Sequence, residues 1–322
     1  MKNIIVLTSG GDAPGMNAAI RAVVRAGYFF GLKVFGSLSG FQGLVNESLI
    51  PLEPDSVANC IQHGGTILKA DRCMAFFEKS TRDKCRQFLK KQHIDGIIVI
   101  GGNGSLKGAA LLANEGGPAV FGIPGTIDND IMGTEYTIGF DTACNTALQA
   151  IDKIRDTASS HNRNFLVEVM GRSSGFLALD VGIAGGAEII LTPEFNIPIA
   201  TLAVTIQQPK RFKQSSIIVV AEAEQPGRSV HIAAQLQQLT QLPYRVCIVG
   251  HTQRGGSPTT IDRKIASEMG FMAVKYLHEG VSHKMIAFTN NQLKLLPLPT
   301  LDTLSRTLTT KDLIDLNNIL CI

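Results

Sequence analysis

Residues 4–17 decide the fold, and they read Ile4-Ile5-Val6-Leu7-Thr8-Ser9-Gly10-Gly11-Asp12-Ala13-Pro14-Gly15-Met16-Asn17. The first four form an unbroken apolar run, as expected of a parallel strand that is covered on both faces. A Gly-rich turn follows, and residues 18–28 then carry apolar side chains at helical spacing. A strand, a Gly-rich turn and a helix in this order form a phosphate-binding arrangement. A plain tight connection stays open, because the turn matches neither the Walker A pattern nor G-x-G-x-x-G.

A second stretch of the same kind follows further along the chain. Residues 94–100 predict a strand and residues 106–113 predict a helix, and the turn between them is Gly101-Gly102-Asn103-Gly104-Ser105. Paired glycines at a strand end let the backbone approach a ligand closely. This turn is therefore a second candidate phosphate site, and it is more specific than a lone pair of glycines.

The rest of the chain continues to alternate between strands and helices. Further strands are expected at 32–36, 119–123, 163–170, 187–191, 217–221 and 244–249, helices at 56–63, 81–92, 141–159, 176–184, 201–209, 230–241 and 262–279, and a loop at 41–44. More than eight such units without signs of barrel closure favour an α/β fold with doubly wound, mainly parallel sheets. Ligands of such sheets bind beyond the carboxyl ends of the strands, where the polar loops can converge on one cleft.

The loop Pro124-Gly125-Thr126-Ile127-Asp128-Asn129-Asp130 follows one of these expected strands. It presents a hydroxyl, an amide and two carboxylates within five positions. One carboxylate can accept a proton and the other can hold a hydrated cation. A turn with Asx-type hydrogen bonds is the alternative interpretation of the same residues.

Composition narrows the class of protein. The chain of 322 residues is 44% hydrophobic and 18% charged, with a net charge of +3 that favours neither nucleic acid nor a membrane surface as partner. The six cysteines form no C-x-x-C pair, which favours buried thiols in a reducing compartment. No apolar run is long enough for a signal peptide or a membrane span, so a cytoplasmic location is expected.

Basic side chains in or beside the loops point to anionic ligands. They are Arg72, Arg163, Arg172, Arg245, Arg254 and His251. Arginine binds phosphate through paired hydrogen bonds. Phosphoryl transfer needs positioning, a metal, positive charge and a base for the attacking hydroxyl, and the loops contain all of these parts.

The chain closely resembles the ATP-dependent 6-phosphofructokinases of the bacterial type, from residue 1 to about residue 280. The resemblance rests on residues 7–17, on 124–130, on Val167-Glu168-Val169-Met170-Gly171-Arg172, and on Gly250-His251-Thr252-Gln253-Arg254-Gly255-Gly256-Ser257-Pro258. It implies a glycolytic kinase that converts ATP and fructose 6-phosphate to ADP and fructose 1,6-bisphosphate. It also implies a homotetramer whose active site lies in a cleft between two domains, 1–138 plus 251–302 for nucleotide and 139–250 plus 303–322 for sugar phosphate.

The resemblance also implies residue roles. Asp128 would be the general base, while Thr126, Arg172 and Gly11 would act at the transferring group, and Asp130 and Asn103 would hold Mg²⁺. ATP would bind at Gly11, Arg72, Cys73, Gly102, Asn103, Gly104 and Ser105. The sugar phosphate would meet Thr126, Asp128, Asp130, Met170, Gly171, Arg172, Glu222, His251 and Arg254, with Arg163 and Arg245 reaching it from a neighbouring subunit. ADP or phosphoenolpyruvate would act as effector at Arg21, Arg25, Arg155, Glu188, Arg211 and Lys213.

Several positions bear on the phosphoryl donor. Pyrophosphate-using relatives tend to carry Asp at position 104 and Lys at position 125, so Gly104 and Gly125 favour ATP. Asn103 stands where the family usually has Asp, which removes a charge near Mg²⁺. Cys73 replaces an aromatic residue beside adenine, within an atypical 68–73 loop. Two alternatives therefore stay open: an impaired regulatory paralogue that binds sugar phosphate, and a pyrophosphate-dependent phosphofructokinase.

Overall fold

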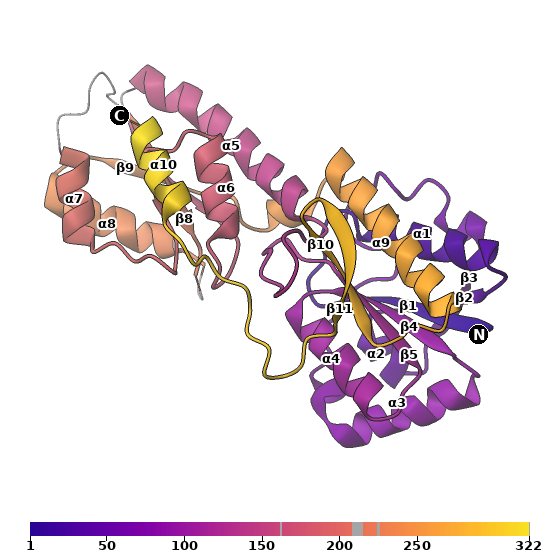
Figure 1. The fold of residues 1–322 in the computed structure, drawn as a ribbon. Coiled ribbons are helices and arrows are strands. Elements are labelled where there is room, and N and C mark those ends of the chain that lie inside the picture. The colour runs from indigo at the N-terminus through magenta and orange to yellow at the C-terminus, as the bar shows by residue number, and fades with distance from the viewer. Residues whose placement is uncertain (162, 208–214, 224–225, 322) are drawn as a thin grey trace. The chain divides into compact units, whose positions relative to one another are not determined.

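The computed structural model describes residues 1–161, 163–207, 215–223 and 226–321 (Figure 1). The chain divides into two compact units. The first unit comprises Met1–Ile127, Ile131–Thr142 and Arg254–Ser305, and the second comprises Asp128–Asp130, Ala143–Gln253 and Arg306–Ile322. None of the described helices is both long enough and apolar enough to cross a membrane.

A seven-stranded sheet forms the centre of the first unit. Its strand order is β11-β10-β5-β4-β1-β2-β3, and the five inner strands run parallel while β3 and β11 pair antiparallel at the two edges. The strands are β1 (Asn3–Ser9), β2 (Lys33–Ser37), β3 (Leu49–Leu52), β4 (Gly96–Gly101), β5 (Ala119–Pro124), β10 (Lys284–Thr289) and β11 (Gln292–Pro297). The central strand β4 is buried along its whole length, which explains its continuous apolar sequence.

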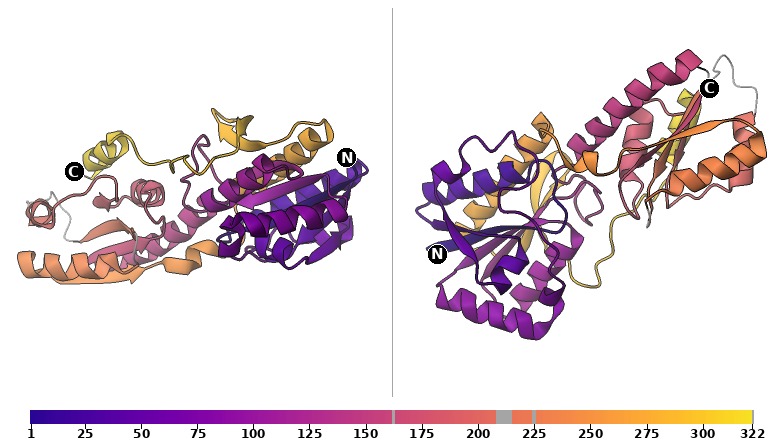
Figure 2. Two further views of the ribbon diagram at one scale, coloured as in Figure 1. Left: turned by 90° about the horizontal axis from the view of Figure 1, so that it is seen from below. Right: turned by 180° about the vertical axis from the view of Figure 1, so that it is seen from behind.

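Helices cover both faces of this sheet. Figures 1 and 2 show α1 and α9 on one face and α3 and α4 on the other. The helices are α1 (Met16–Phe29), α2 (Phe41–Val45), α3 (Lys79–Lys91), α4 (Asn103–Asn114) and α9 (Thr260–His278), with short 3₁₀ turns at Pro54–Val57 and Met74–Phe77. Residues of α3 and α4 share one buried apolar cluster with Ile5, Leu7, Ile97 and Val99 of the sheet.

The second unit is built on a four-stranded parallel sheet with the order β7-β8-β6-β9. Its strands are β6 (Asn164–Val169), β7 (Ile189–Leu191), β8 (Ser216–Ala221) and β9 (Tyr244–Ile248). Its helices are α5 (Phe140–His161), whose first residues lie in the first unit, α6 (Phe176–Ala184), α7 (Ile199–Gln207), α8 (Arg228–Thr240) and α10 (Asp312–Leu320), and a 3₁₀ turn spans Gly250–Arg254. Buried residues of β6, β8, α7 and α8 form one apolar core.

The predicted fold class is confirmed, because both sheets are mainly parallel and every sheet is flanked by helices. Two predicted elements are wrong. The expected loop 41–44 is the helix α2, whose Phe41 is buried and stacks on Phe76 with ring centroids 4.0 Å apart. The expected helix 56–63 is replaced by the 3₁₀ turn Pro54–Val57, since Asn59 adopts a left-handed φ of 53° that ends it. Residues 208 and 209 of the expected helix 201–209 lie outside the described residues.

Candidate active site

The two Gly-rich turns of the first unit lie on neighbouring strands. Because β1 pairs with β2 on one side and with β4 on the other, the chain reverses its direction of winding between β1 and β4. Ligands of doubly wound sheets bind at such a switch point, beyond the carboxyl ends of the strands. The turn at Gly10 follows β1 and the turn at Gly102 opens α4, so both phosphate-binding candidates are at this point.

Glycine is required where these turns approach each other. A Cβ atom on Gly101 would lie 2.5 Å from the Ser9 carbonyl oxygen, and one on Gly10 would lie 3.2 Å from Ser105 Oγ. At Gly104 the opposite holds, since a Cβ there would meet no atom within 4 Å. The first backbone N–H groups of a helix have no partner within the helix. The open space beside the first turn of α4 therefore fits the phosphates of a nucleotide.

Thr126 belongs to the same group of turns. Its backbone N–H donates to the Ile138 carbonyl at 3.1 Å, and its own carbonyl accepts from Thr137 Oγ1 at 2.6 Å. Its hydroxyl lies 3.9 Å from the position that a Cβ on Gly102 would occupy. Gly125 is packed so closely that its Cβ would come within 3.2 Å of both Ile100 and Met16. A long side chain at position 125 would therefore have to displace core atoms.

Arg254 lies against the first turn. Its Nη1 donates to the Asp12 carbonyl at 2.9 Å and would be 2.5 Å from a Cβ on Gly11. The guanidinium thus covers the Gly11–Asp12 backbone within the first unit. A larger residue at position 11 would require the Arg254 guanidinium to shift.

The remaining nucleotide candidates differ in exposure. Arg72 is exposed, whereas Cys73 is largely buried in the apolar cluster of the first unit. Asn103 is half-buried, and its Nδ2 donates to Ser305 Oγ at 3.2 Å. Asn103, the first residue of α4, therefore places an amide and not a carboxylate beside the open space at Gly104.

Asp128 begins the short part of the loop that belongs to the second unit. Its side chain is buried, and its Oδ2 lies 3.9 Å from Arg172 Nε. Its carbonyl accepts from Ser174 Oγ at 2.8 Å, in the turn that connects β6 to α6. Arg172 itself is about half exposed and adopts a left-handed φ of 50°. A buried carboxylate next to a partly free guanidinium suits a base beside an anionic substrate.

The carboxyl ends of β6, β8 and β9 bring the sugar-site candidates together. Met170 and Gly171 follow β6, Glu222 follows β8, and the turn that begins at Gly250 follows β9. The carboxylate Oε1 of Glu222 accepts from the Arg172 N–H at 3.3 Å, and the Met170 N–H donates to Gln253 Oε1 at 2.9 Å. His251 is exposed in the same region. This edge of the sheet therefore presents both acidic and basic groups to a polar ligand.

Arg163 and Arg245 are not brought to this edge. Arg163 precedes β6, and Arg245 is the second residue of β9, paired with Phe165 at the amino end of the sheet. At ~3.3 Å per residue along the strands, Arg245 lies roughly 17–20 Å and Arg163 roughly 23–26 Å from Met170 and Gly171. Within one chain these arginines cannot share a phosphate with Glu222 or His251.

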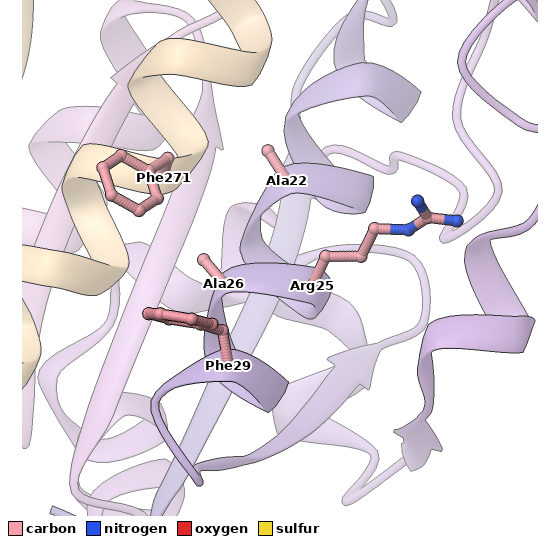
Figure 3. Close-up of a pocket in the computed structure, with 5 residues that line it drawn as sticks. All are labelled: Ala22, Arg25, Ala26, Phe29 and Phe271. Atoms are coloured by element: carbon pink, nitrogen blue, oxygen red, sulfur yellow. The ribbon is translucent and has the colours of Figure 1, made fainter.

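The effector candidates fall into separate groups. In the second unit Arg155 Nη1 lies 3.3 Å from the buried Glu188 carboxylate, and Arg155 Nη2 donates to the Gly185 and Gly186 carbonyls. In the first unit Arg21 and Arg25 lie on α1. Arg25 borders a pocket with Ala22, Ala26, Phe29 and Phe271, and Figure 3 shows its guanidinium extending away from the two phenylalanine rings. Arg211 and Lys213 lie outside the described residues.

The structure adds residues for which no role was predicted. Ser174 and Gln253 hold the backbone at Asp128 and Met170, and both lie in motifs whose functional partners were recognised. Both are polar residues in predicted turns, and this pattern could have indicated that their side chains bind the backbone. Glu168 accepts from the Gly227 N–H at 2.6 Å and from the N–H and hydroxyl of Ser229, so it caps α8. No local sequence pattern indicated that role.

The side chains present can be compared with those that the expected Mg²⁺ and ATP require. Among the described residues, no cluster of three or more His, Cys, Asp or Glu side chains could hold a metal. Mg²⁺ usually keeps several waters and binds one or two carboxylates together with substrate phosphates. The half-buried Asp130 fits that mode, and the open space at Gly104 fits ATP.

The fold and these residues define an α/β protein of the phosphoryl-transfer class. A family model described as phosphofructokinase matches residues 3–277. The chain belongs to the phosphofructokinase family.

Individual relatives support this membership. The chain is 59% identical over 321 residues to an ATP-dependent 6-phosphofructokinase of Coxiella burnetii, covering 100% of this chain and 98% of the relative. It is 50% identical over 299 residues to ATP-dependent 6-phosphofructokinase 1 of Thermus thermophilus, covering 92% and 93% of the two chains.

Solved structures share the fold. Phosphofructokinase from Saccharomyces cerevisiae superposes with a TM-score of 0.86 at 36% identity, over 92% of this chain and 45% of that longer chain. A pyrophosphate-dependent phosphofructokinase from Marinobacter aquaeolei superposes with a TM-score of 0.85 over 100% and 92% of the two chains. At 22% identity, the second likeness concerns the fold alone.

Proposed function

We propose that this chain transfers the γ-phosphoryl group of ATP to the 1-hydroxyl of fructose 6-phosphate, giving ADP and fructose 1,6-bisphosphate. The observation that carries the proposal is the geometry of Asp128, a buried carboxylate that lies 3.9 Å from Arg172 and follows Thr126 in the loop. A relative 59% identical over its full length bears the name of this enzyme, which supports the same reaction.

Asp128 is the general base. Its carboxylate accepts the proton of the sugar 1-hydroxyl as that oxygen attacks the γ-phosphorus, and the bond from this phosphorus to the bridging oxygen of ADP breaks. Ser174 fixes the orientation of Asp128 through the backbone carbonyl. Arg172 lies where its guanidinium can stabilise charge on the transferring group.

The first unit supplies the donor side. The turns at Gly11 and at residues 102–105 offer backbone N–H groups to the phosphates of ATP, and Arg72 provides positive charge from an exposed position. The Thr126 hydroxyl beside Gly102 can donate to the transferring group. ATP is favoured over pyrophosphate because Gly104 leaves space for a larger donor, while a Cβ on Gly125 would press on Ile100 and Met16 at 3.2 Å.

Asp130 and Asn103 are the residues that would hold Mg²⁺. The ion, when bound, neutralises charge on the β- and γ-phosphates. Asn103 offers an amide oxygen without negative charge, so Asp130 contributes more of the protein's attraction for the cation.

The sugar phosphate binds at the carboxyl edge of the second sheet. Met170, Gly171 and Glu222 contact the sugar, and His251 and Arg254 pair with its 6-phosphate. Arg163 and Arg245 serve a neighbouring subunit, which explains why they lie at the opposite end of the strands. We propose a cytoplasmic homotetramer with an effector site for ADP or phosphoenolpyruvate at Arg21, Arg25, Arg155, Glu188, Arg211 and Lys213.

The direct test is to supply the purified chain with ATP, Mg²⁺ and fructose 6-phosphate and to couple product formation to aldolase. Phosphorus NMR of the same mixture identifies the new phosphate ester at the 1-position. We expect both ATP-dependent turnover and that product. Binding of fructose 6-phosphate without turnover would instead identify a regulatory paralogue.

A further inference from the structure

The three backbone carbonyls of Asp128, Asn129 and Asp130 are all held by the second unit. Ser174 Oγ donates to the Asp128 carbonyl at 2.8 Å. Arg306 Nη1 donates to the Asn129 carbonyl at 3.4 Å, and the Arg306 backbone N–H donates to the Asp130 carbonyl at 2.7 Å. One residue from near the C-terminus therefore contacts two of the three loop residues.

The loop needs such contacts because its backbone is strained. Asn129 adopts a left-handed φ of 51°. Asparagine enters this region more readily than most residues, but it still has a free-energy cost there. A sparsely populated conformation persists only where the surrounding structure determines it. Arg306 binds the carbonyls of Asn129 and of the residue after it, so it holds the backbone at the strained position.

The Arg306 side chain is itself fixed in place. Its guanidinium carbon lies 4.2 Å from the centroid of the Phe176 ring, a geometry that favours a cation–π interaction. Phe176 is buried and is the first residue of α6, directly after the turn that carries Arg172 and Ser174. The same guanidinium thus contacts the loop and the helix that positions its neighbours.

Contacts further along the C-terminal segment anchor Arg306. The Leu308 N–H donates to Glu194 Oε1 at 3.3 Å, and that oxygen also accepts from the Gly175 N–H at 2.9 Å. On α10, the buried Asn317 donates from Nδ2 to the Ala187 carbonyl at 2.9 Å. The segment is therefore attached to the second unit near both ends of α6 and cannot shift freely away from the loop.

We propose that Arg306 is a positioning residue for the phosphoryl transfer. It fixes the Asn129–Asp130 backbone, and through it the orientation of the Asp128 and Asp130 carboxylates. This inference rests on the function proposed above. It gives the C-terminal segment a role in the reaction, although no residue of that segment contacts substrate in the proposal.

The test compares Arg306→Met with Lys311→Met. The first variant keeps the backbone bond to Asp130, but it loses the guanidinium that donates to Asn129 and lies over the Phe176 ring. The second removes a cation of the same segment that lies 5.4 Å from the Phe195 ring. We expect kcat of Arg306→Met to fall about tenfold, the lower end for a lost hydrogen bond from a charged donor. KM for fructose 6-phosphate should stay within about twofold of wild type, and Lys311→Met should match wild type.

A second measurement does not depend on turnover. Hydrogen exchange in a peptide spanning residues 124–131 should be faster in Arg306→Met than in wild type or Lys311→Met. If Arg306→Met folds poorly, Arg306→Lys replaces it, and its kcat should fall because an ammonium lacks the planar fork of donors. Equal kcat and equal exchange in Arg306 and Lys311 variants would overturn the inference. An inactive wild type with faster exchange in the variant would refute the proposed function and leave the positioning role supported.

Discussion

Asp128 is the residue on which the proposed chemistry depends most. Its carboxylate is buried, its carbonyl accepts from Ser174 Oγ, and its Oδ2 lies 3.9 Å from Arg172 Nε. Thr126 and Asp130 flank it in the same loop but belong to different units of the fold. In the proposed reaction, this short loop thus contributes groups that act on the phosphoryl donor and on the sugar.

Replacing Asp128 by Ser should lower kcat by about 10²–10⁴-fold, the range in which a positioned base contributes to proton transfer. The serine keeps a polar group in the loop but cannot accept the proton at neutral pH. Binding of fructose 6-phosphate, measured as protection against thermal unfolding, should persist because the proposed sugar contacts of Glu222 and Met170 remain. A variant with near-normal turnover would remove Asp128 from the role of base.

Asn103→Asp should reduce the Mg²⁺ concentration that gives half-maximal rate, because it adds a negative charge beside the proposed metal site. The Ser305 hydroxyl that now accepts from Asn103 can donate to the new carboxylate instead. Asn114→Asp, at the exposed last residue of the same helix, is the matched control and should not change the Mg²⁺ dependence. Identical Mg²⁺ titrations for both variants would contradict this account of Asn103.

Asp262 connects two elements of the first unit, α9 and the N-terminus of α5. Its Oδ1 accepts from the Gly139 N–H at 2.8 Å, and its Oδ2 accepts from the N–H and hydroxyl of Thr142. Burial raises the pKa of the Asp262 carboxyl to about 6, although the bonds from Thr142 and Gly139 oppose that rise. Ile138, next to Gly139, pairs with the backbone at Gly125 and Thr126, so this cap lies beside the proposed active loop.

The raised pKa predicts a pH dependence of stability. The folded state binds the proton more tightly than the unfolded state, so the Asp262 contribution to stability falls as pH rises from about 4 to about 6. A shift of roughly two units corresponds to about 3 kcal/mol. The thermal midpoint of wild type should therefore fall relative to that of Asp262→Asn between pH 4.5 and 6.5. Parallel midpoint curves would show that the carboxyl does not titrate in this way.

Sequence alone predicted the elements with strong local patterns. The buried strands β4 and β5 and the helix α6 match their expected positions, since apolar runs and helical spacing are local properties. The edge strand β3, the hairpin β10–β11 and α10 were not predicted. Their burial alternates or is incomplete, and their formation depends on neighbours that are distant in sequence.

The same division holds for the candidate site. Asp128, Arg172 and the glycine turns were predicted because they lie in short, recognisable motifs. Arg306 was not predicted, because its contacts with Asn129 and Asp130 span more than 170 positions of the chain and its own neighbours form no motif. Asp262 was missed for the same reason, since the helix that it caps begins about 120 positions earlier.

At the scale of the whole molecule, the chain passes repeatedly between two units, and each contains some of the candidate residues. The nucleotide turns are in the first unit, and Asp128, Glu222 and His251 are in the second. Arg163 and Arg245 lie at the amino ends of β6 and β9, remote from the sugar candidates of their own chain. An assembly of several chains would give these two arginines a ligand.

Light scattering coupled to size-exclusion chromatography should therefore give a mass of four times 34.5 kDa. In that assembly Arg163→Ala and Arg245→Ala should raise KM for fructose 6-phosphate while kcat changes little, because each would weaken binding of the 6-phosphate. A monomer with full activity would contradict both the assembly and the role of these arginines.

The central claim is ATP-dependent phosphorylation of fructose 6-phosphate, and the choice of donor tests it most directly. Initial rates of fructose 1,6-bisphosphate formation should be measured with ATP and with pyrophosphate across a Mg²⁺ titration, with Asp128→Ser as the blank. We predict that ATP supports turnover and that pyrophosphate gives no more than the blank. Turnover with pyrophosphate alone, or with neither donor at saturating Mg²⁺, would contradict the account.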